Sequence, residues 1–81
     1  MYTEKTIEYI NPKTRSKVTI TVTQKEAVHG MLRLIVTVDG TTTYNKVMNA
    51  DPTREKANAG HNTLIHDGYQ VTVNSFATQD A

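Results

Sequence analysis

Three histidines are the side chains of this chain best suited to binding a metal ion or moving a proton, namely His29, His61 and His66. His61 and His66 stand five residues apart in a segment with helical spacing, which separates them by about 140° around a helix. His29 belongs to a distant polar loop. Because these side chains share no face, the sequence predicts no metal site, and we expect one packed and two solvated histidines.

The pair His66-Asp67 could act as a general base, with the carboxylate orienting the imidazole. The nearest candidate hydroxyl, that of Thr63, has no nucleophile motif around it, and capping of a helix C-terminus by His66 explains the same residues. The acidic residues are scattered among turns and helix ends, and the four glycines form no phosphate-binding loop. The sequence therefore predicts a protein that is not an enzyme and that uses no cofactor.

Basic residues gather at one place, the first predicted hairpin, which carries Lys13, Arg15 and Lys17. Such a projection can bind phosphate or an acidic surface, and the alternative is a solvated turn that prevents pairing between sheet edges. With nine Lys and Arg against eight Asp and Glu, the net charge is +1. This balance lacks the strong basic excess that is typical of nucleic-acid-binding proteins.

A second candidate surface is the predicted start of the helix, where Arg54 and Lys56 lie beside free backbone N–H groups. Polar and aromatic residues around it suit a protein–protein interface, in which Tyr and Arg commonly supply the anchors. The predicted binding residues on the two surfaces are Lys13, Arg15, Lys17, Tyr44, Arg54, Glu55, Lys56 and Asn58.

Strands must position these residues, and the hydrophobic pattern predicts them over residues 6–10, 17–23, 31–38 and 42–48. In residues 17–23 the apolar side chains fall on one face and the threonines on the other, solvent-facing side. Residues 11–14 have the composition of a type I turn, with Pro12 at its second position. Asp39-Gly40 predicts a type I′ hairpin turn, which needs positive φ at both residues.

The segment Asp51-Pro52 predicts the start of a helix that runs to about residue 66, with the Asp51 carboxylate accepting hydrogen bonds from free backbone N–H groups. Gly60 costs about 1 kcal/mol relative to alanine inside a helix, which favours close packing of the helix on a strand. Gly68 is the predicted C-terminal cap, a last strand includes residues 69–73, and residues 77–81 form a frayed tail.

Length and composition indicate one domain covering residues 1–81, with 37% hydrophobic and 21% charged residues. The chain has no cysteine, which excludes disulfides and thiolate chemistry, and no apolar run long enough for a bilayer. We therefore expect a cytoplasmic protein without membrane contact. The predicted fold is α+β, an antiparallel sheet of four to five strands with one helix packed on one face, in the order β-β-β-β-α-β.

The run from Leu32 through Asp39-Gly40 and Tyr44 to residues 53–59 and Leu64 resembles the last two strands and the second helix of a double-stranded-RNA-binding domain. That family carries a basic cluster at this helix start, followed by alanines. Arg54 and Lys56 match the cluster in type, whereas residues 60–62 replace the alanines, and the family's first helix has no counterpart here. The resemblance implies RNA binding through the helix start.

As a whole, the chain resembles the small anti-CRISPR proteins encoded by phages and other mobile elements. The likeness lies in general character, which combines a few antiparallel strands, one helix, no catalytic apparatus, and an Asp-Gly hairpin followed by an Asp-Pro helix start. It implies a stoichiometric inhibitor that binds a host protein complex, often at a surface needed for nucleic acid.

Three functional hypotheses follow from these patterns. The first is a non-enzymatic, phage- or mobile-element-type protein that blocks a host nucleoprotein complex in the bacterial cytoplasm by steric occlusion. The second is a small module that contacts the phosphates of nucleic acid through the basic hairpin and the helix start. The third is a structural virion or assembly subunit whose outer strands pair with other copies. The sequence leaves the identity of the partner and the oligomeric state open.

Overall fold

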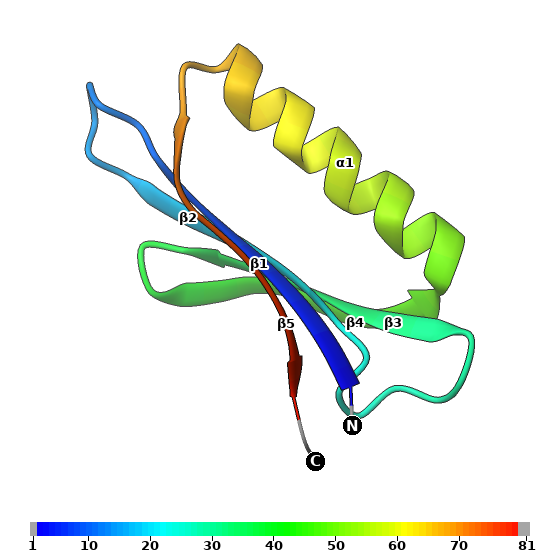
Figure 1. Cartoon of the computed structure of the whole chain (residues 1–81). Coiled ribbons are helices and arrows are strands. Elements are labelled where there is room, and N and C mark those ends of the chain that lie inside the picture. The colour runs from blue at the N-terminus through cyan, green and yellow to red at the C-terminus, as the bar shows by residue number, and fades with distance from the viewer. Residues whose placement is uncertain (1, 80–81) are drawn as a thin grey trace.

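The computed structural model describes residues 2–79 and contains five strands and one helix (Figure 1). In chain order these are β1 (Tyr2–Ile10), β2 (Lys17–Thr23), β3 (Met31–Val38), β4 (Thr41–Asn49), α1 (Ala50–His66) and β5 (Gln70–Gln79). The strands form one antiparallel sheet in the order β4-β3-β2-β1-β5, with α1 packed on one face. This arrangement confirms the predicted α+β fold and its element order.

The first and last strands support each other and are longer than predicted. β1 begins at Tyr2, which pairs with Gln79, and Glu4 pairs with Ala77. The prediction of a frayed tail is therefore wrong for residues 77–79, which belong to β5. Pairing with β1 orders this segment although its sequence has no strong local alternation. Residues 80 and 81 of that tail lie outside the described residues.

The two hairpin turns differ in how well local sequence predicts them. Asp39 and Gly40 have φ of 50° and 85°, which confirms the positive-φ pair that a type I′ turn requires. The first reversal extends beyond the predicted turn, because the Arg15 N–H donates to the Asn11 carbonyl at 2.7 Å and Arg15 has a φ of 63°. The basic side chain of Arg15 thus stands at the left-handed position of this loop.

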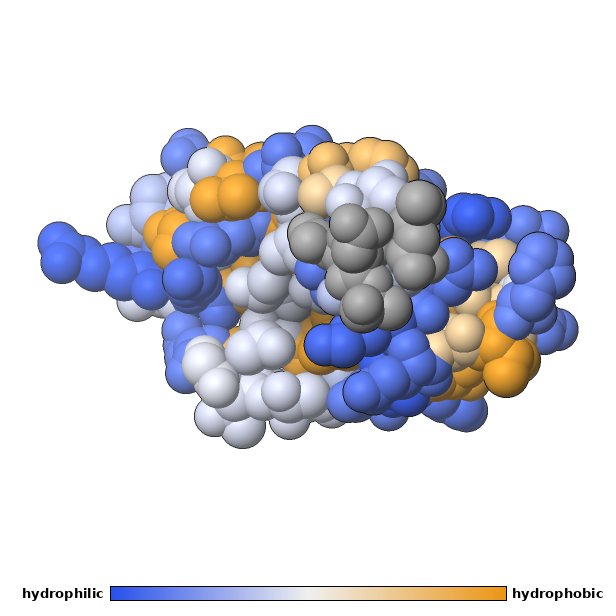
Figure 2. Space-filling model, turned by 60° about the horizontal axis from the view of Figure 1, so that its bottom comes forward, coloured by the Kyte–Doolittle hydropathy of each residue, from blue (hydrophilic) through white to orange (hydrophobic). Residues whose placement is uncertain are grey.

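The core lies between α1 and one face of the sheet. Val18, Ile20 and Leu34 are buried there together with Leu32 and Tyr9, as the alternation predicts for the β2 and β3 residues. The opposite face, which we call the open face, carries no helix among the described elements. Figure 2, which brings the underside of Figure 1 forward, shows separated apolar patches among pale and blue residues.

The open face is rich in threonine, as the pattern in residues 17–23 predicts. The Thr6 and Thr21 hydroxyls lie 3.3 Å apart across β1 and β2. Thr23 departs from the prediction because it is buried, and its Oγ1 accepts a 3.0 Å hydrogen bond from the Lys25 N–H. That contact ties the loop after β2 to the end of the strand.

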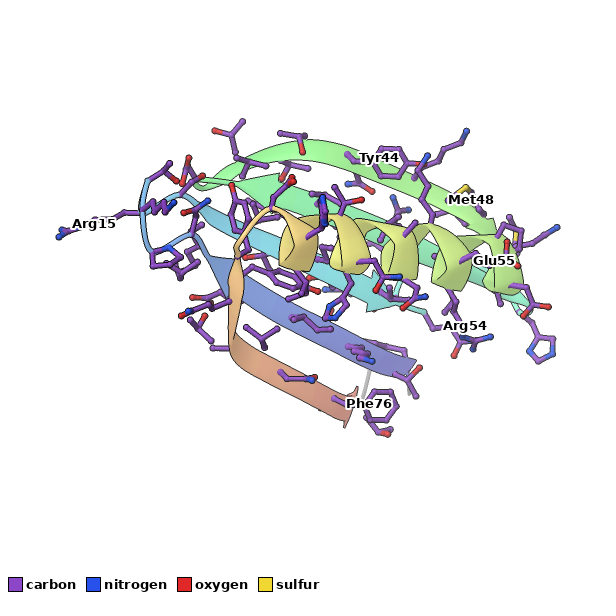
Figure 3. All side chains as sticks on the ribbon, turned by 90° about the horizontal axis from the view of Figure 1, so that it is seen from above. Arg15, Tyr44, Met48, Arg54, Glu55 and Phe76 are labelled. Atoms are coloured by element: carbon purple, nitrogen blue, oxygen red, sulfur yellow. The ribbon has the colours of Figure 1, made fainter. Side chains whose placement is uncertain are left out.

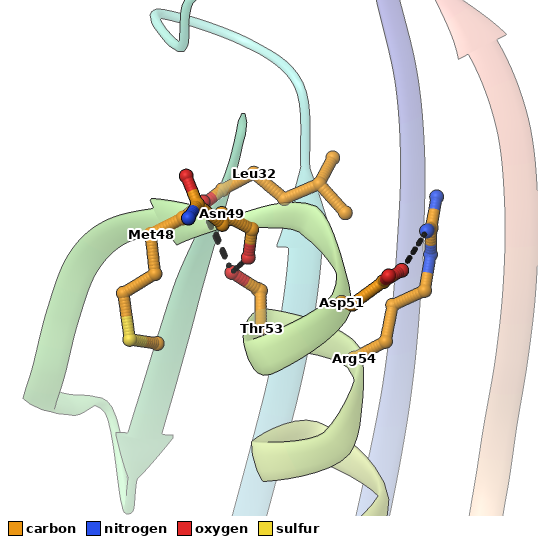
Figure 4. Close-up of polar contacts among 6 residues, drawn as sticks. All are labelled: Leu32, Met48, Asn49, Asp51, Thr53 and Arg54. Carbon is orange, nitrogen blue, oxygen red and sulfur yellow. Dashed lines mark hydrogen bonds and ion pairs between the residues drawn. The ribbon is translucent and has the colours of Figure 1, made fainter. Parts of the chain in front are cut away.

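The start of α1 differs from the prediction in which residue anchors it. The helix begins at Ala50, its N-cap Asn49 makes no capping hydrogen bond through its side chain, and the Asp51 carboxylate instead lies 3.6 Å from Arg54. The fully buried Thr53 donates from its hydroxyl to the Asn49 carbonyl at 2.8 Å (Figure 4). The carbonyl of Leu32 on β3 lies 3.4 Å from the same hydroxyl. Thr53 therefore ties the first turn of the helix to β3, but its hydroxyl donates to carbonyls and does not take the place of the predicted carboxylate cap on the free N–H groups.

The helix ends as predicted and packs mainly on β2, β3 and β4. Gly68 has a φ of 93°, and its N–H donates to the Ile65 carbonyl, which closes the helix C-terminus. A Cβ placed on Gly60 would lie 3.4 Å from Ile20 Cδ1 on β2, which confirms the close approach of helix and strand. Within the described residues, no helix has the length and apolar character needed to cross a bilayer.

Candidate functional site

Because α1 sits over the β4 side of the sheet, a groove of about 420 Å³ opens between the helix and strands β1 and β5. We call it the helix groove, and its principal residues are Lys5 and Ile7 of β1, Arg54, Asn58 and His61 of α1, and Phe76 of β5. Figure 3 shows Arg54 reaching from the helix toward β1 and Phe76 standing on β5. Helix and strand residues, rather than loop residues, form its walls.

The helix groove is cationic at its mouth. Lys5 lines the groove and makes no ion pair within residues 2–79. Arg54 has one carboxylate nearby, that of Asp51 at 3.6 Å, and both side chains are exposed. Strand alternation places Glu4 and Glu8 of β1 on the open face. Two cationic side chains therefore line the groove, and no carboxylate lies among the lining residues that the structure describes.

The inner end of the groove is closed by a polar contact between sheet and helix. The hydroxyl oxygen of Tyr9 lies 2.6 Å from His61 Nδ1, and the two rings meet edge to face with centroids 5.5 Å apart. Tyr9 is fully buried, and this burial raises its pKa above the ordinary value of 10.0. The contact holds α1 to β1 with a neutral phenol.

The structure does not bring the two predicted binding surfaces together. Figure 3 places Arg15 at one end of the molecule and Arg54 with Glu55 at the other, along a dimension of 40 Å. Lys13 is exposed on the same hairpin as Arg15, and Lys17 pairs with Glu8 at 3.2 Å on the open face. One small ligand cannot contact both ends.

The predicted helix residues divide between two flanks of α1. Arg54 and Asn58 line the helix groove. Lys56 lies on the β4 flank with its Nζ 4.6 Å from the centroid of the Tyr44 ring, beside a smaller hollow of about 190 Å³. Glu55 is exposed and makes no ion pair among the residues described. The helix groove therefore includes two of the eight predicted binding residues.

Sequence reasoning missed Phe76 and the role of His61 in the groove. Neither could be assigned from local pattern, because Phe76 meets Lys5 only through the pairing of β5 with β1, and His61 meets Tyr9 across 52 positions of sequence. A lone phenylalanine in a polar C-terminal segment was the only available signal.

The titratable residues form no metal-binding cluster in the described part of the chain, where no three His, Cys, Asp or Glu side chains gather. His61 is half-buried, while His29 and His66 are exposed, which is the division that the sequence favours.

Comparison of this chain with protein-family models, with curated proteins and with solved structures finds no match. Its function is therefore inferred from the geometry and charge of its own surfaces.

Proposed function

We propose that this protein is a non-enzymatic binding protein whose helix groove receives an acidic segment of a larger partner, and that it acts by occluding that part of the partner. The observation that carries this proposal is that Lys5 of β1 and Arg54 of α1 line the same groove together with apolar side chains such as Ile7. Apolar walls supply affinity by burial, and a few charged groups supply orientation.

The rigidity of the groove supports binding to a protein surface. Its walls come from α1 and from paired strands, and the contact between Tyr9 and His61 joins them. The backbone of such elements is already ordered before binding, so no loop has to be ordered and more of the contact energy appears as affinity. A small protein can thereby block a much larger one at a one-to-one ratio.

The partner that we propose is a nucleoprotein complex of a bacterial host, with an anti-CRISPR protein as the most concrete form of the inhibitor. The support is the resemblance of the chain to such proteins in size and architecture. The charge of the groove indicates which part of the complex is bound, because Lys5 and Arg54 favour an acidic protein surface over a basic nucleic-acid channel. Inhibition would then come from blocking contacts between protein parts.

The test is a nuclease-treated pull-down from bacterial lysate, followed by affinity measurements on the purified partner. Two double variants carry the same charge change at opposite ends of the molecule, Lys5→Glu with Arg54→Glu in the groove and Lys13→Glu with Arg15→Glu at the hairpin. All four side chains are exposed, so both variants should fold, which circular dichroism checks.

We expect the groove variant to weaken binding of the captured complex at least tenfold and the hairpin variant to change it less than threefold. Addition of the wild-type protein should inhibit the nuclease activity of the complex with an endpoint at one protein per complex. Equal affinity of the groove variant and the wild type would overturn the assignment of the groove, and the loss of every partner on nuclease treatment would favour nucleic acid as the ligand.

A further inference from the structure

The edge strand β5 exposes more large apolar side chains than any other element described. Of the five large hydrophobic residues exposed in residues 2–79, three belong to β5, namely Val71 at 42%, Val73 at 44% and Phe76 at 68% exposure. β5 is the last strand of the sheet and has β1 as its sole neighbour. Its outer backbone N–H and C=O groups therefore face none of the strands described in residues 2–79.

β5 has a bulge at Thr72 in its pairing with β1, but it lacks the other features that keep edge strands from pairing. Its sequence from Gln70 to Gln79 contains no charged residue, no proline and no glycine. The other edge, β4, carries Lys46 and exposes no large apolar side chain. Long, apolar and uncharged edges are templates for pairing with another strand, and natural proteins commonly interrupt them with charges or proline.

We propose that β5 pairs antiparallel with β5 of a second copy of this chain, so that two five-stranded sheets continue into one. A two-fold axis brings each strand against itself, and such self-pairing suffers no like-charge repulsion because the strand is neutral. From Val73 to Gln79 the strand is regular, and a ladder along this part is about 24 Å long and pairs the free backbone groups of both edges there.

The second copy also covers the exposed side chains on both faces. Pairing with β1 places Phe76 on the helix side, opposite Lys5, and Val73 on the open side, opposite Glu8. A strand added at this edge lies beside both residues and removes them from water. Removal of this apolar surface from water favours association of the two copies.

Nothing described in the fold obstructs this approach. α1 packs mainly on β2, β3 and β4, and Figure 3 shows β5 at the outer edge of the sheet, beyond β1 and clear of the helix. An antiparallel pair has its two-fold axis perpendicular to the sheet, so both helices lie on the same face of the dimer. The two helix grooves then meet over the paired β5 strands and form one channel.

The oligomeric state tests this proposal, with a matched pair of lysine variants. Ser75 lies in the middle of the uncharged segment and faces the open side beside Thr6, away from Lys5 and Arg54. Ser75→Lys would place like charges near each other across the two-fold axis. Thr42→Lys adds the same charge at an exposed position on the opposite edge, β4, and serves as the control.

We expect static light scattering at a protein concentration of about 1 mM to approach twice the monomer mass for the wild type and for Thr42→Lys. For Ser75→Lys we expect a dimer dissociation constant at least tenfold higher. Hydrogen exchange should slow in β5, and not in β4, as the wild-type concentration rises from about 10 µM to about 1 mM.

A wild-type protein that is monomeric at about 1 mM would overturn the proposal, as would a dimer that Thr42→Lys dissociates and Ser75→Lys does not. The oligomeric state is measured without the partner, so its outcome is read separately from the function proposed above. Lys5 and Arg54 are unchanged in both lysine variants, so dimerisation and binding of an acidic partner can fail separately.

Discussion

At the scale of single residues, the hydroxyl of Thr53 is the contact on which the start of α1 depends most. This side chain is fully buried and donates to the Asn49 carbonyl at 2.8 Å. Thr53→Val keeps the shape of the side chain but removes a hydroxyl that donates from a fully buried position. We expect the free energy of unfolding to fall by about 1–3 kcal/mol, as measured by urea denaturation.

An exposed threonine provides the control for this substitution. Thr43 lies on the surface of β4, where its hydroxyl donates to the Val36 carbonyl at 3.3 Å. Thr43→Val should change stability by less than about 0.5 kcal/mol because water can replace that contact. Equal effects of the two substitutions would show that burial of the Thr53 hydroxyl is unimportant.

Tyr9 provides a pH-dependent prediction, because burial raises its pKa above 10.0 in the folded state. The folded protein holds the phenol proton more tightly than the unfolded chain, so stability is fully present below pH 10.0 and falls as the pH rises toward the folded-state pKa. Tyr9→Phe removes this titration. The loss of stability between about pH 8 and about pH 11 should therefore be smaller in the variant than in the wild type.

The comparison at two pH values separates this effect from the hydrogen bond. Tyr9→Phe also removes the 2.6 Å contact with His61, which should lower stability by roughly 1 kcal/mol at either pH. Urea denaturation midpoints of both proteins at both pH values give two alkaline losses of stability, and their difference is the part due to ionisation of the Tyr9 phenol. An identical alkaline loss in variant and wild type would contradict the assigned origin of the shift.

At the scale of elements, Gly60 reports how closely α1 packs on the sheet. A Cβ at this position would lie 3.4 Å from Ile20 Cδ1, a terminal methyl that can move slightly. Gly60→Ala gains helix propensity, so we expect stability to rise by about 0.5–1 kcal/mol. Gly60→Val adds methyl groups to a tight contact and should instead destabilise the protein by about 1–3 kcal/mol.

The exposed neighbour Ala59 gives the matched control for backbone propensity. Ala59→Gly should lower stability by about 1 kcal/mol, since it removes helix propensity without touching the sheet. Thermal unfolding of the three variants and of the wild type measures these changes in stability. Stabilisation by Gly60→Val would show that helix and strand are less closely packed than the contact with Ile20 indicates.

The elements also show which parts of the fold local sequence predicts. The alternation in β2 and β3 is clear because one face of each strand is buried under α1, and those bounds match the prediction. β1 and β5 are longer than predicted because their ends depend on each other across the whole chain. For the same reason, local sequence predicts the helix start but not its anchor, Thr53, whose partners include a carbonyl of β3.

At the scale of the whole molecule, the basic residues lie far apart, and this distribution bears on whether the partner is a protein or a nucleic acid. The basic residues Lys13 and Arg15 occupy the end opposite Arg54, and Lys17 is paired with Glu8. The candidate site was therefore predictable only in part. The types of its charged residues were evident in sequence, but their grouping depends on where the sheet places α1.

The salt dependence of nucleic-acid binding tests this separation. Simultaneous contact of five phosphates by Lys13, Arg15, Lys17, Arg54 and Lys56 would give a log–log slope of affinity against salt of about −4.5. Because these residues lie at two ends of a molecule 40 Å long, and Lys56 stacks on Tyr44, we expect a slope no steeper than about −2.7. Fluorescence anisotropy with a short labelled duplex between about 50 and 200 mM salt measures it.

The hairpin variant Lys13→Glu with Arg15→Glu completes this experiment. If residual nucleic-acid binding is non-specific attraction to the exposed hairpin, this variant should abolish it, whereas the groove variant Lys5→Glu with Arg54→Glu should preserve most of it. A slope near −4.5 that both variants reduce would mean that the two ends act together on one nucleic acid. Such a result would require the duplex to follow the length of the molecule, and it would replace the acidic protein segment as the proposed ligand.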